Sequence, residues 1–209
     1  MKTYNTIRKK AKQEIVINRS RFIGRAFPVV DEDDALLQIE QIRGDFPDAS
    51  HHCYAYVIGH GSNIQRFNDD GEPGGTAGMP ILQVIQKQEI EDVLVVVTRY
   101  FGGTKLGAGG LVRAYSKSTA EVLEKAEKAQ MTLSNQGTLV IDYALWGTLE
   151  YFLHEKGIPI LDVDYMEKVT ATIMTWMSWE SFCAMMIELS NGKAVCKHSR
   201  QVYHSWPNS

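Results

Sequence analysis

The fold of this chain is constrained most by one stretch, residues 93–115, around which the rest of the sequence is organised. Residues 93–97 are all apolar and four of the five are valine, which is typical of a strand buried on both faces. Five glycines follow between Gly102 and Gly110, and apolar residues then recur at helical spacing from Leu111 to Leu123. The stretch therefore predicts a buried strand, a Gly-rich loop and a helix.

The Gly-rich loop has the composition of an anion site. Glycine allows positive φ and a close approach of a ligand to the backbone, and a helix N-terminus offers free N–H groups with a positive dipole end. A tight turn that only packs the helix on the sheet is the structural alternative. The spacing matches neither a Walker A loop nor a GxGxxG fingerprint. The candidate anion- or nucleic-acid-binding residues are Arg99, Gly102, Gly103, Lys105, Gly107, Gly109, Gly110 and Arg113.

A second loop, residues 68–80, is rich in turn residues and carries three carboxylates, Asp69, Asp70 and Glu72. These carboxylates are candidates for a general base or for magnesium ligands, although their spacing departs from an EF-hand. The structural alternative is that Asp69 and Asp70 accept hydrogen bonds from the loop's own amides and cap the following helix. That helix is expected to start near Thr76 or Gly78.

Residues 51–59 alternate as a strand does, which puts His51 and Cys53 on one face and His52 on the other. Adjacent histidines on a strand point to opposite sides, so the pair is not expected to bind one metal. His51 and Cys53 are candidate catalytic residues, and the alternative for Cys53 is a small buried hydrophobe.

The remaining pattern predicts two domains, residues 1–130 and 136–209. In the first, residues 14–27 are expected to form a hairpin, and a helix is expected from its N-cap at Asp31 to the residue before Pro47. In the second, strands at 138–142, 158–164, 168–177 and 194–203 alternate with helices at 145–155 and 179–189. This βαββαβ order is typical of a ferredoxin-like sandwich.

Composition indicates a globular chain of 209 residues, with 44% hydrophobic and 22% charged residues. The net charge of −3 arises in residues 131–209, where 5 Lys and Arg face 8 Asp and Glu, so a polyanion is expected to bind residues 1–130. Cys53, Cys183 and Cys196 lack CxxC spacing, which predicts a reducing compartment and no zinc site. We also expect no signal peptide, no membrane span and a cytoplasmic location.

The sequence resembles the Impact family in three blocks. They are Ser50 to Tyr56, Asp69 to Leu82, and Arg99 to Tyr115, with RYFGGTKLGAGGLVRAY as the longest. The resemblance implies an α+β first domain with the left-handed βαβ fold of domain four of elongation factor G and of GHMP kinases, which periodicity alone would not predict. It also implies a C-terminal ferredoxin-like domain.

Eukaryotic Impact proteins regulate translation, so the resemblance implies a translation-associated regulator that binds RNA, a ribosome or a translation factor through the Gly-rich basic face. Aromatic side chains such as Tyr100 and Phe101 would then stack on bases. One alternative is an enzyme that acts on a phosphorylated small molecule or nucleotide with magnesium bound at Asp69, Asp70 and Glu72. Another is a protein-interaction regulator that does not bind nucleic acid. Binding is favoured over catalysis, and no cofactor is expected outside the magnesium alternative.

Overall fold

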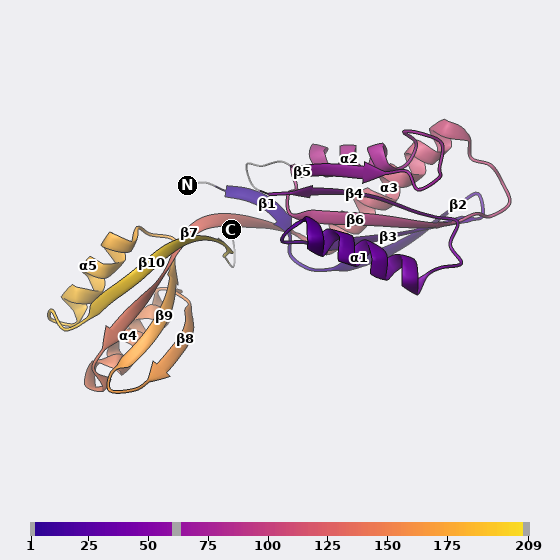
Figure 1. Ribbon diagram of the computed structural model, residues 1–209. Helices are drawn as coiled ribbons and strands as arrows, with labels where there is room; N and C mark the ends of the chain where they lie inside the picture. The colour runs from indigo at the N-terminus through magenta and orange to yellow at the C-terminus, as the bar shows by residue number, and fades with distance from the viewer. Residues whose placement is uncertain (1–2, 60–63, 207–209) are drawn as a thin grey trace. The chain divides into compact units, whose positions relative to one another are not determined.

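The computed structural model describes residues 3–59 and 64–206, which form two compact units that divide at Gln130 and Met131. Each unit is an α+β sandwich with its own core (Figure 1). The strands and helices of the first unit are β1 (Thr3–Ile7), β2 (Ala11–Ile17), β3 (Ser20–Pro28), α1 (Glu32–Asp45), β4 (His51–Ile58), β5 (Ile64–Asn68), α2 (Gly78–Lys87), β6 (Val93–Tyr100) and α3 (Gly107–Ala126).

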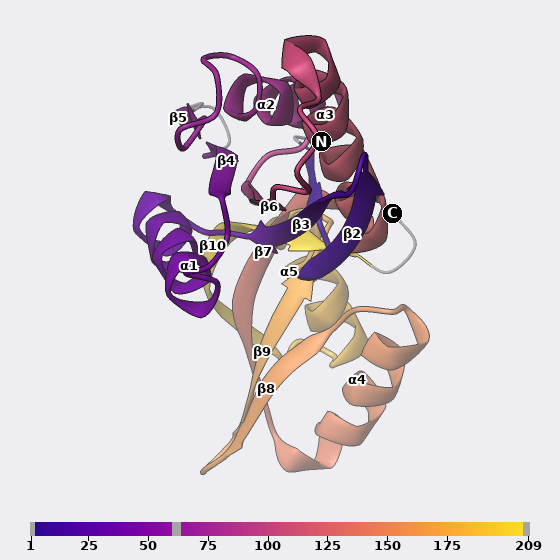
Figure 2. The ribbon, with the colours of Figure 1, turned by 90° about the vertical axis from the view of Figure 1, so that its right-hand side faces the viewer.

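The first unit is built on the sheet β2-β3-β6-β4-β5, in which neighbouring strands are antiparallel. Strand β6 lies at its centre, and residues 93–97 are fully buried, as the valine run predicts. Val93, Val95 and Val97 pack in the core under α2 and α3, whereas Leu94 and Val96 pack under α1. Figure 2 shows α1 on one face of this sheet and α2 with α3 on the other.

Local sequence signals explain several element boundaries of this unit. The β2–β3 turn holds Asn18 and Arg19 at φ values of 46° and 67°, so the predicted hairpin is confirmed. Asp31 caps α1 by accepting a hydrogen bond from the Asp34 backbone N–H at 2.8 Å, also as predicted. The edge strand β5 was not predicted, because its residues are mostly exposed and show no alternation.

The second unit contains β7 (Lys128–Ile141), α4 (Tyr143–Glu155), β8 (Ile160–Tyr165), β9 (Val169–Thr175), α5 (Trp179–Leu189) and β10 (Val195–Ser205). Its strands are ordered β10-β7-β9-β8, and every pair among them is antiparallel. Both α4 and α5 pack against one face of the sheet, because Trp146 and Phe182 share a core with Leu139 and Ile173. The βαββαβ sandwich is therefore present.

Strand β7 begins ten residues before the predicted strand at 138–142. The early part contains Thr132 and Ser134, which are buried although they are polar. Ser134 is satisfied in the interior because its hydroxyl accepts a hydrogen bond from the Trp206 indole N–H at 2.9 Å. Because these buried residues are polar, the early part of β7 lacks the apolar alternation by which a strand is predicted.

Two glycines of the second unit provide a test of its packing, because replacing each by alanine is expected to change the stability in opposite directions. A Cβ added to Gly137 would lie 2.3 Å from the Trp179 ring, which stacks on Phe182, whereas one added to Gly147 in α4 would meet nothing within 4 Å in the described chain. We expect Gly137→Ala to destabilise the unit by about 1–3 kcal/mol through overpacking. We expect Gly147→Ala to stabilise it by about 0.5–1 kcal/mol through helix propensity. Urea unfolding followed by tryptophan fluorescence measures both, and equal effects would contradict the packing at Gly137.

Candidate functional site

The three sequence blocks meet around one cavity of the first unit, with a volume of about 350 Å³. They meet because β4 and β6 are antiparallel neighbours, which pairs His51 with Arg99 across the sheet. The loop between β5 and α2 and the loop between β6 and α3 close around that pair. The lining residues are His51, Glu72, Pro73, Arg99, Phe101, Lys105, Leu106, Gly107, Ala108 and Leu111.

A buried ion pair forms part of the cavity wall. The Arg99 Nη1 atom lies 2.6 Å from Glu72 Oε1, and the two side chains are only 6% and 3% exposed. The Tyr115 hydroxyl of α3 donates a second hydrogen bond to the same Glu72 oxygen at 2.7 Å. The pairing explains how two charges tolerate burial, since either one alone would be strongly unfavourable there. Glu72 therefore holds Arg99 and Tyr115. The role of Tyr115 has no signal in the sequence beyond the place of this residue on the buried side of the helix.

Arg99 thus differs from the other two predicted cations. It is buried and paired, whereas Lys105 and Arg113 are exposed. The pairing is incomplete, because the buried Nε of Arg99 has no hydrogen-bond partner among the described residues. The guanidinium also lies 5.4 Å from the Phe22 ring and 5.5 Å from the half-exposed Phe101 ring.

The Asp69 carboxylate holds its own loop together. It accepts hydrogen bonds from the backbone N–H groups of Gly75, Ala77 and Gly78 at 2.8, 3.0 and 2.8 Å. Two of these groups belong to the start of α2, whose N-cap residue Ala77 makes no side-chain cap of its own, so the Asp69 carboxylate caps this helix from the preceding loop. This arrangement is the structural alternative that the sequence left open for Asp69, and it leaves this carboxylate engaged by the backbone.

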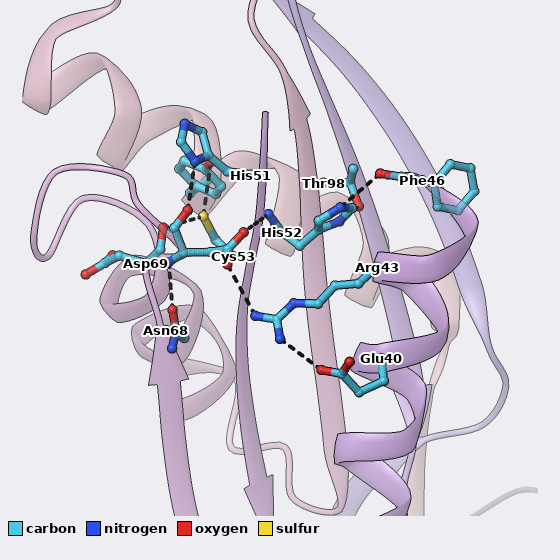
Figure 3. A network of polar contacts seen from close by, with 11 residues as sticks. Glu40, Arg43, Phe46, His51, His52, Cys53, Asn68, Asp69 and Thr98 are labelled. Carbon is cyan, nitrogen blue, oxygen red and sulfur yellow. Dashed lines mark hydrogen bonds and ion pairs between the residues drawn. The ribbon is translucent and has the colours of Figure 1, made fainter. Parts of the chain in front are cut away.

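Asp70 joins the loop to β4 and α1. Its carboxylate accepts from the His52 backbone N–H at 2.6 Å and from Arg43 at 3.2 Å, and Arg43 also pairs with Glu40 (Figure 3). Its backbone carbonyl oxygen lies 2.8 Å from His51 Nδ1. A carbonyl oxygen only accepts, so Nδ1 carries the proton and Nε2 of neutral His51 is an acceptor.

His51 and His52 lie on opposite sides of β4, as the alternation predicts and Figure 3 shows. The His52 ring lies on the α1 face, 3.2 Å from the Thr98 hydroxyl and 3.1 Å from the Phe46 carbonyl oxygen. Burial of this ring lowers the pKa of His52 from its usual range. His52 is therefore a structural histidine, and only His51 lines the cavity.

Cys53 is buried, and its single S–H proton has two acceptors within reach, the Asp69 carbonyl oxygen at 3.0 Å and the Tyr115 hydroxyl oxygen at 3.3 Å. Burial strongly raises the pKa of its thiol, so the thiol stays protonated and is a poor nucleophile at neutral pH. The structure thus favours the alternative in which Cys53 is a small core residue.

The carboxylates predicted as magnesium ligands point to different partners. Asp69 binds backbone amides, Asp70 binds His52 and Arg43, and Glu72 binds Arg99 and Tyr115. Within residues 3–59 and 64–206, no group of three or more His, Cys, Asp or Glu residues has the geometry to hold a metal ion.

The Gly-rich loop combines structural glycines with an open helix end. Gly102 packs directly on the β2–β3 turn, since an added Cβ would lie 2.1 Å from the Arg19 backbone. Gly103 and Gly107 have φ values of 82° and 69°, which favour glycine. Gly109 lies alongside Arg113, whose Nη1 would be 3.8 Å from an added Cβ, and Gly110 packs on the Leu106 side chain. Among the described residues no side chain caps the start of α3.

The chain is similar to known proteins over both units. Residues 18–123 match the model of the Impact N-terminal domain, and residues 139–193 match a domain of unknown function, DUF1949. The fold and the motifs therefore define a two-domain α+β protein of the Impact type. The chain is 41% identical to the IMPACT family member YvyE of Bacillus subtilis, over 96% of this chain and 93% of that protein.

A second relative, the IMPACT family member YigZ of Escherichia coli, is 33% identical over 84% of this chain and 88% of its own. A solved crystal structure of a hypothetical protein is 30% identical, with a TM-score of 0.63 over 94% of this chain and 97% of that one. The chain belongs to the IMPACT family.

The role of Asp69 leads to a stability prediction. Asp69→Asn replaces one accepting oxygen with an NH₂ group that faces N–H donors, so we expect a loss of about 2–3 kcal/mol in the free energy of unfolding. The exposed Asp33, in the first turn of α1, offers a control: Asp33→Asn should cost less than about 1 kcal/mol. Urea unfolding compares the two variants, and equal costs would argue against the amide contacts of Asp69.

The pKa of His52 leads to a pH prediction. Because the folded pKa is lowered, the unfolded chain binds the proton more tightly, and stability falls as the pH drops below the unfolded value of about 6.5. The loss of stability reaches its full size once the pH is below the pKa of His52 in the folded protein. His52→Gln keeps a donor for the Phe46 carbonyl but does not titrate, so its melting temperature should fall less than that of the wild type between pH 7.5 and 5.5. A parallel fall would show that His52 contributes nothing to the pH dependence.

Proposed function

We propose that this chain is a translation-associated regulator that binds single-stranded RNA, free or on a ribosome, through the loop between β6 and α3. The observation that carries the proposal is the cavity in which a half-exposed aromatic ring, Phe101, lies beside Lys105 and the uncapped start of α3. Anionic backbone and flat bases are the two features of single-stranded nucleic acid, and this combination matches both.

The electrostatic support comes from the arrangement of positive groups around the loop. Lys105 and Arg113 flank the first turn of α3, whose N–H groups form the positive end of the helix dipole. The exposed Arg19 is on the β2–β3 turn against which Gly102 packs. Phosphates are the natural ligand of such a helix start with nearby cations.

The aromatic support comes from two residues at the end of β6. The Phe101 side chain is 51% exposed and borders the cavity, with the Arg99 guanidinium 5.5 Å from its ring centre. Tyr100 is half-buried, and the Arg21 guanidinium lies 5.2 Å from its ring centre. A stacked base gains about 1–3 kcal/mol from such a ring and needs no particular sequence.

Family membership supports the biological setting. The resemblance to the Impact family implies a role in the regulation of translation, and this chain belongs to that family. The excess of acidic residues at positions 131–209 favours RNA contacts in the first unit and a protein-docking role for the second. We place the protein in the cytoplasm. Among the residues that the structure describes, no helix has the length and apolar character needed to cross a membrane.

Binding of a fluorescent single-stranded RNA over a salt series tests the proposal, with ribosome co-sedimentation in parallel. Affinity should fall steeply with salt, because bound phosphates release counterions. In Lys105→Ala/Arg113→Ala, the slope of log K against log salt should shrink by roughly 1.4, at about 0.7 for each lost contact.

The matched control is Lys87→Ala/Lys117→Ala, which makes the same charge change at exposed positions in α2 and further along α3. This variant should keep the wild-type slope. Absence of RNA and ribosome binding at low salt would overturn the proposal and favour a protein partner. Equal losses in both double variants would show that the attraction is not specific to the loop.

A further inference from the structure

The cavity beside the Gly-rich loop is lined partly by buried charge, which limits what can occupy it. Arg99 and Glu72 border the cavity although their side chains are 6% and 3% exposed. Its volume of about 350 Å³ is at the lower end of the roughly 300–1,000 Å³ range of small-molecule sites. A space of this size fits one nucleotide and not a stretch of RNA.

The hydrogen-bond donors around the cavity exceed what its own acceptors use. Arg99 is 95% buried, and its Nη1 is directed to Glu72, but the buried Nε has no partner among the described residues. Lys105, Gly107 and Ala108, at the uncapped start of α3, border the same space. The Arg99 Nε atom is itself inaccessible, so the positive groups open to an occupant are Lys105 and the uncapped helix start, and a cation beside a helix N-terminus favours an anionic ligand.

Apolar walls occupy the rest of the cavity. Phe101 contributes a half-exposed aromatic ring, and Leu106 and Leu111 add aliphatic surface. His51 borders the same cavity, and its Nε2 is an acceptor suited to a ribose hydroxyl, because Nδ1 is bound to the Asp70 carbonyl. Phosphate, ribose and base each have a suitable group in one small space.

We propose that this cavity binds the terminal nucleotide of an RNA strand, with a phosphate monoester at the start of α3 and Lys105 and the base stacked on Phe101. The proposal rests on the RNA-binding function above and names the part of the RNA that is bound. A monoester carries close to two negative charges, whereas an internal phosphodiester carries one. A strand end also enters a small cavity with one segment of chain, whereas an internal nucleotide requires two.

The test compares three short RNAs of one sequence, with a 5′-phosphate, a 3′-phosphate or hydroxyls at both ends, each labelled internally with the same fluorophore. At moderate salt the wild type should bind one phosphorylated form at least about tenfold more tightly than the hydroxyl form. The matching nucleoside monophosphate should compete for the cavity, and the nucleoside should compete at least about tenfold less well.

Substitutions at the cavity test whether the preference for phosphorylated RNA arises there. Lys105→Ala should remove most of the phosphate preference, and Phe101→Ala should weaken competition by the nucleoside monophosphate by about tenfold. Lys87→Ala, in the last turn of α2, is the control and should keep both. Phe101 and Lys105 are exposed, so neither change removes a core contact.

The outcomes separate this proposal from the general one. Equal affinity for all three RNAs would overturn the terminal-nucleotide site and leave RNA binding by the loop intact. A phosphate preference that survives both Lys105→Ala and Phe101→Ala would also overturn it, because the phosphate would then bind elsewhere. If the protein binds none of the three RNAs at low salt, both proposals fail.

Discussion

The buried contact between Glu72 and Arg99 connects all parts of the candidate site. Glu72 belongs to the loop before α2, Arg99 to the central strand β6, and Tyr115, which donates to the same carboxylate oxygen, to α3. Removing either charge would leave the other buried and unpaired, which typically lowers the free energy of unfolding by about 3–5 kcal/mol. The position of the cavity walls relative to one another therefore depends on this one carboxylate, and Glu72 acts as a structural centre although it borders the cavity.

The neighbouring aspartates solve a different physical problem. A loop of this length that folds back over a sheet carries many backbone N–H groups, and each needs an acceptor once water is excluded. Asp69 accepts three of them, while Asp70 ties the loop to β4 and α1. An acidic run that suggests metal chemistry in a sequence thus serves in this fold to replace the water lost by the backbone.

Sequence reasoning predicted the parts of the fold that depend on local signals. The valine run of β6, the cap at Asp31 and the alternation of β4 each follow from short-range rules, and the family resemblance added the two-domain α+β organisation. Strand β5 and the early part of β7 were missed, because exposure and buried polar residues mask their pattern. For the site, the three motif blocks were found, and the local amide contacts of Asp69 were one of the two alternatives that the sequence left open. The contact between Arg99 and Glu72 was not predicted, because it depends on how a distant loop packs on the central strand.

The uncapped start of α3 has a consequence for the motions of the protein. A helix whose first turn contains Gly107, Gly109 and Gly110 and no capping side chain among the described residues begins with its least stable segment. The rest of the helix is fixed by the core through Leu111, Ala114 and Tyr115. Fraying is thereby confined to the turn that borders the cavity. An occupant would slow amide hydrogen exchange in that turn while leaving the exchange of the buried turns unchanged.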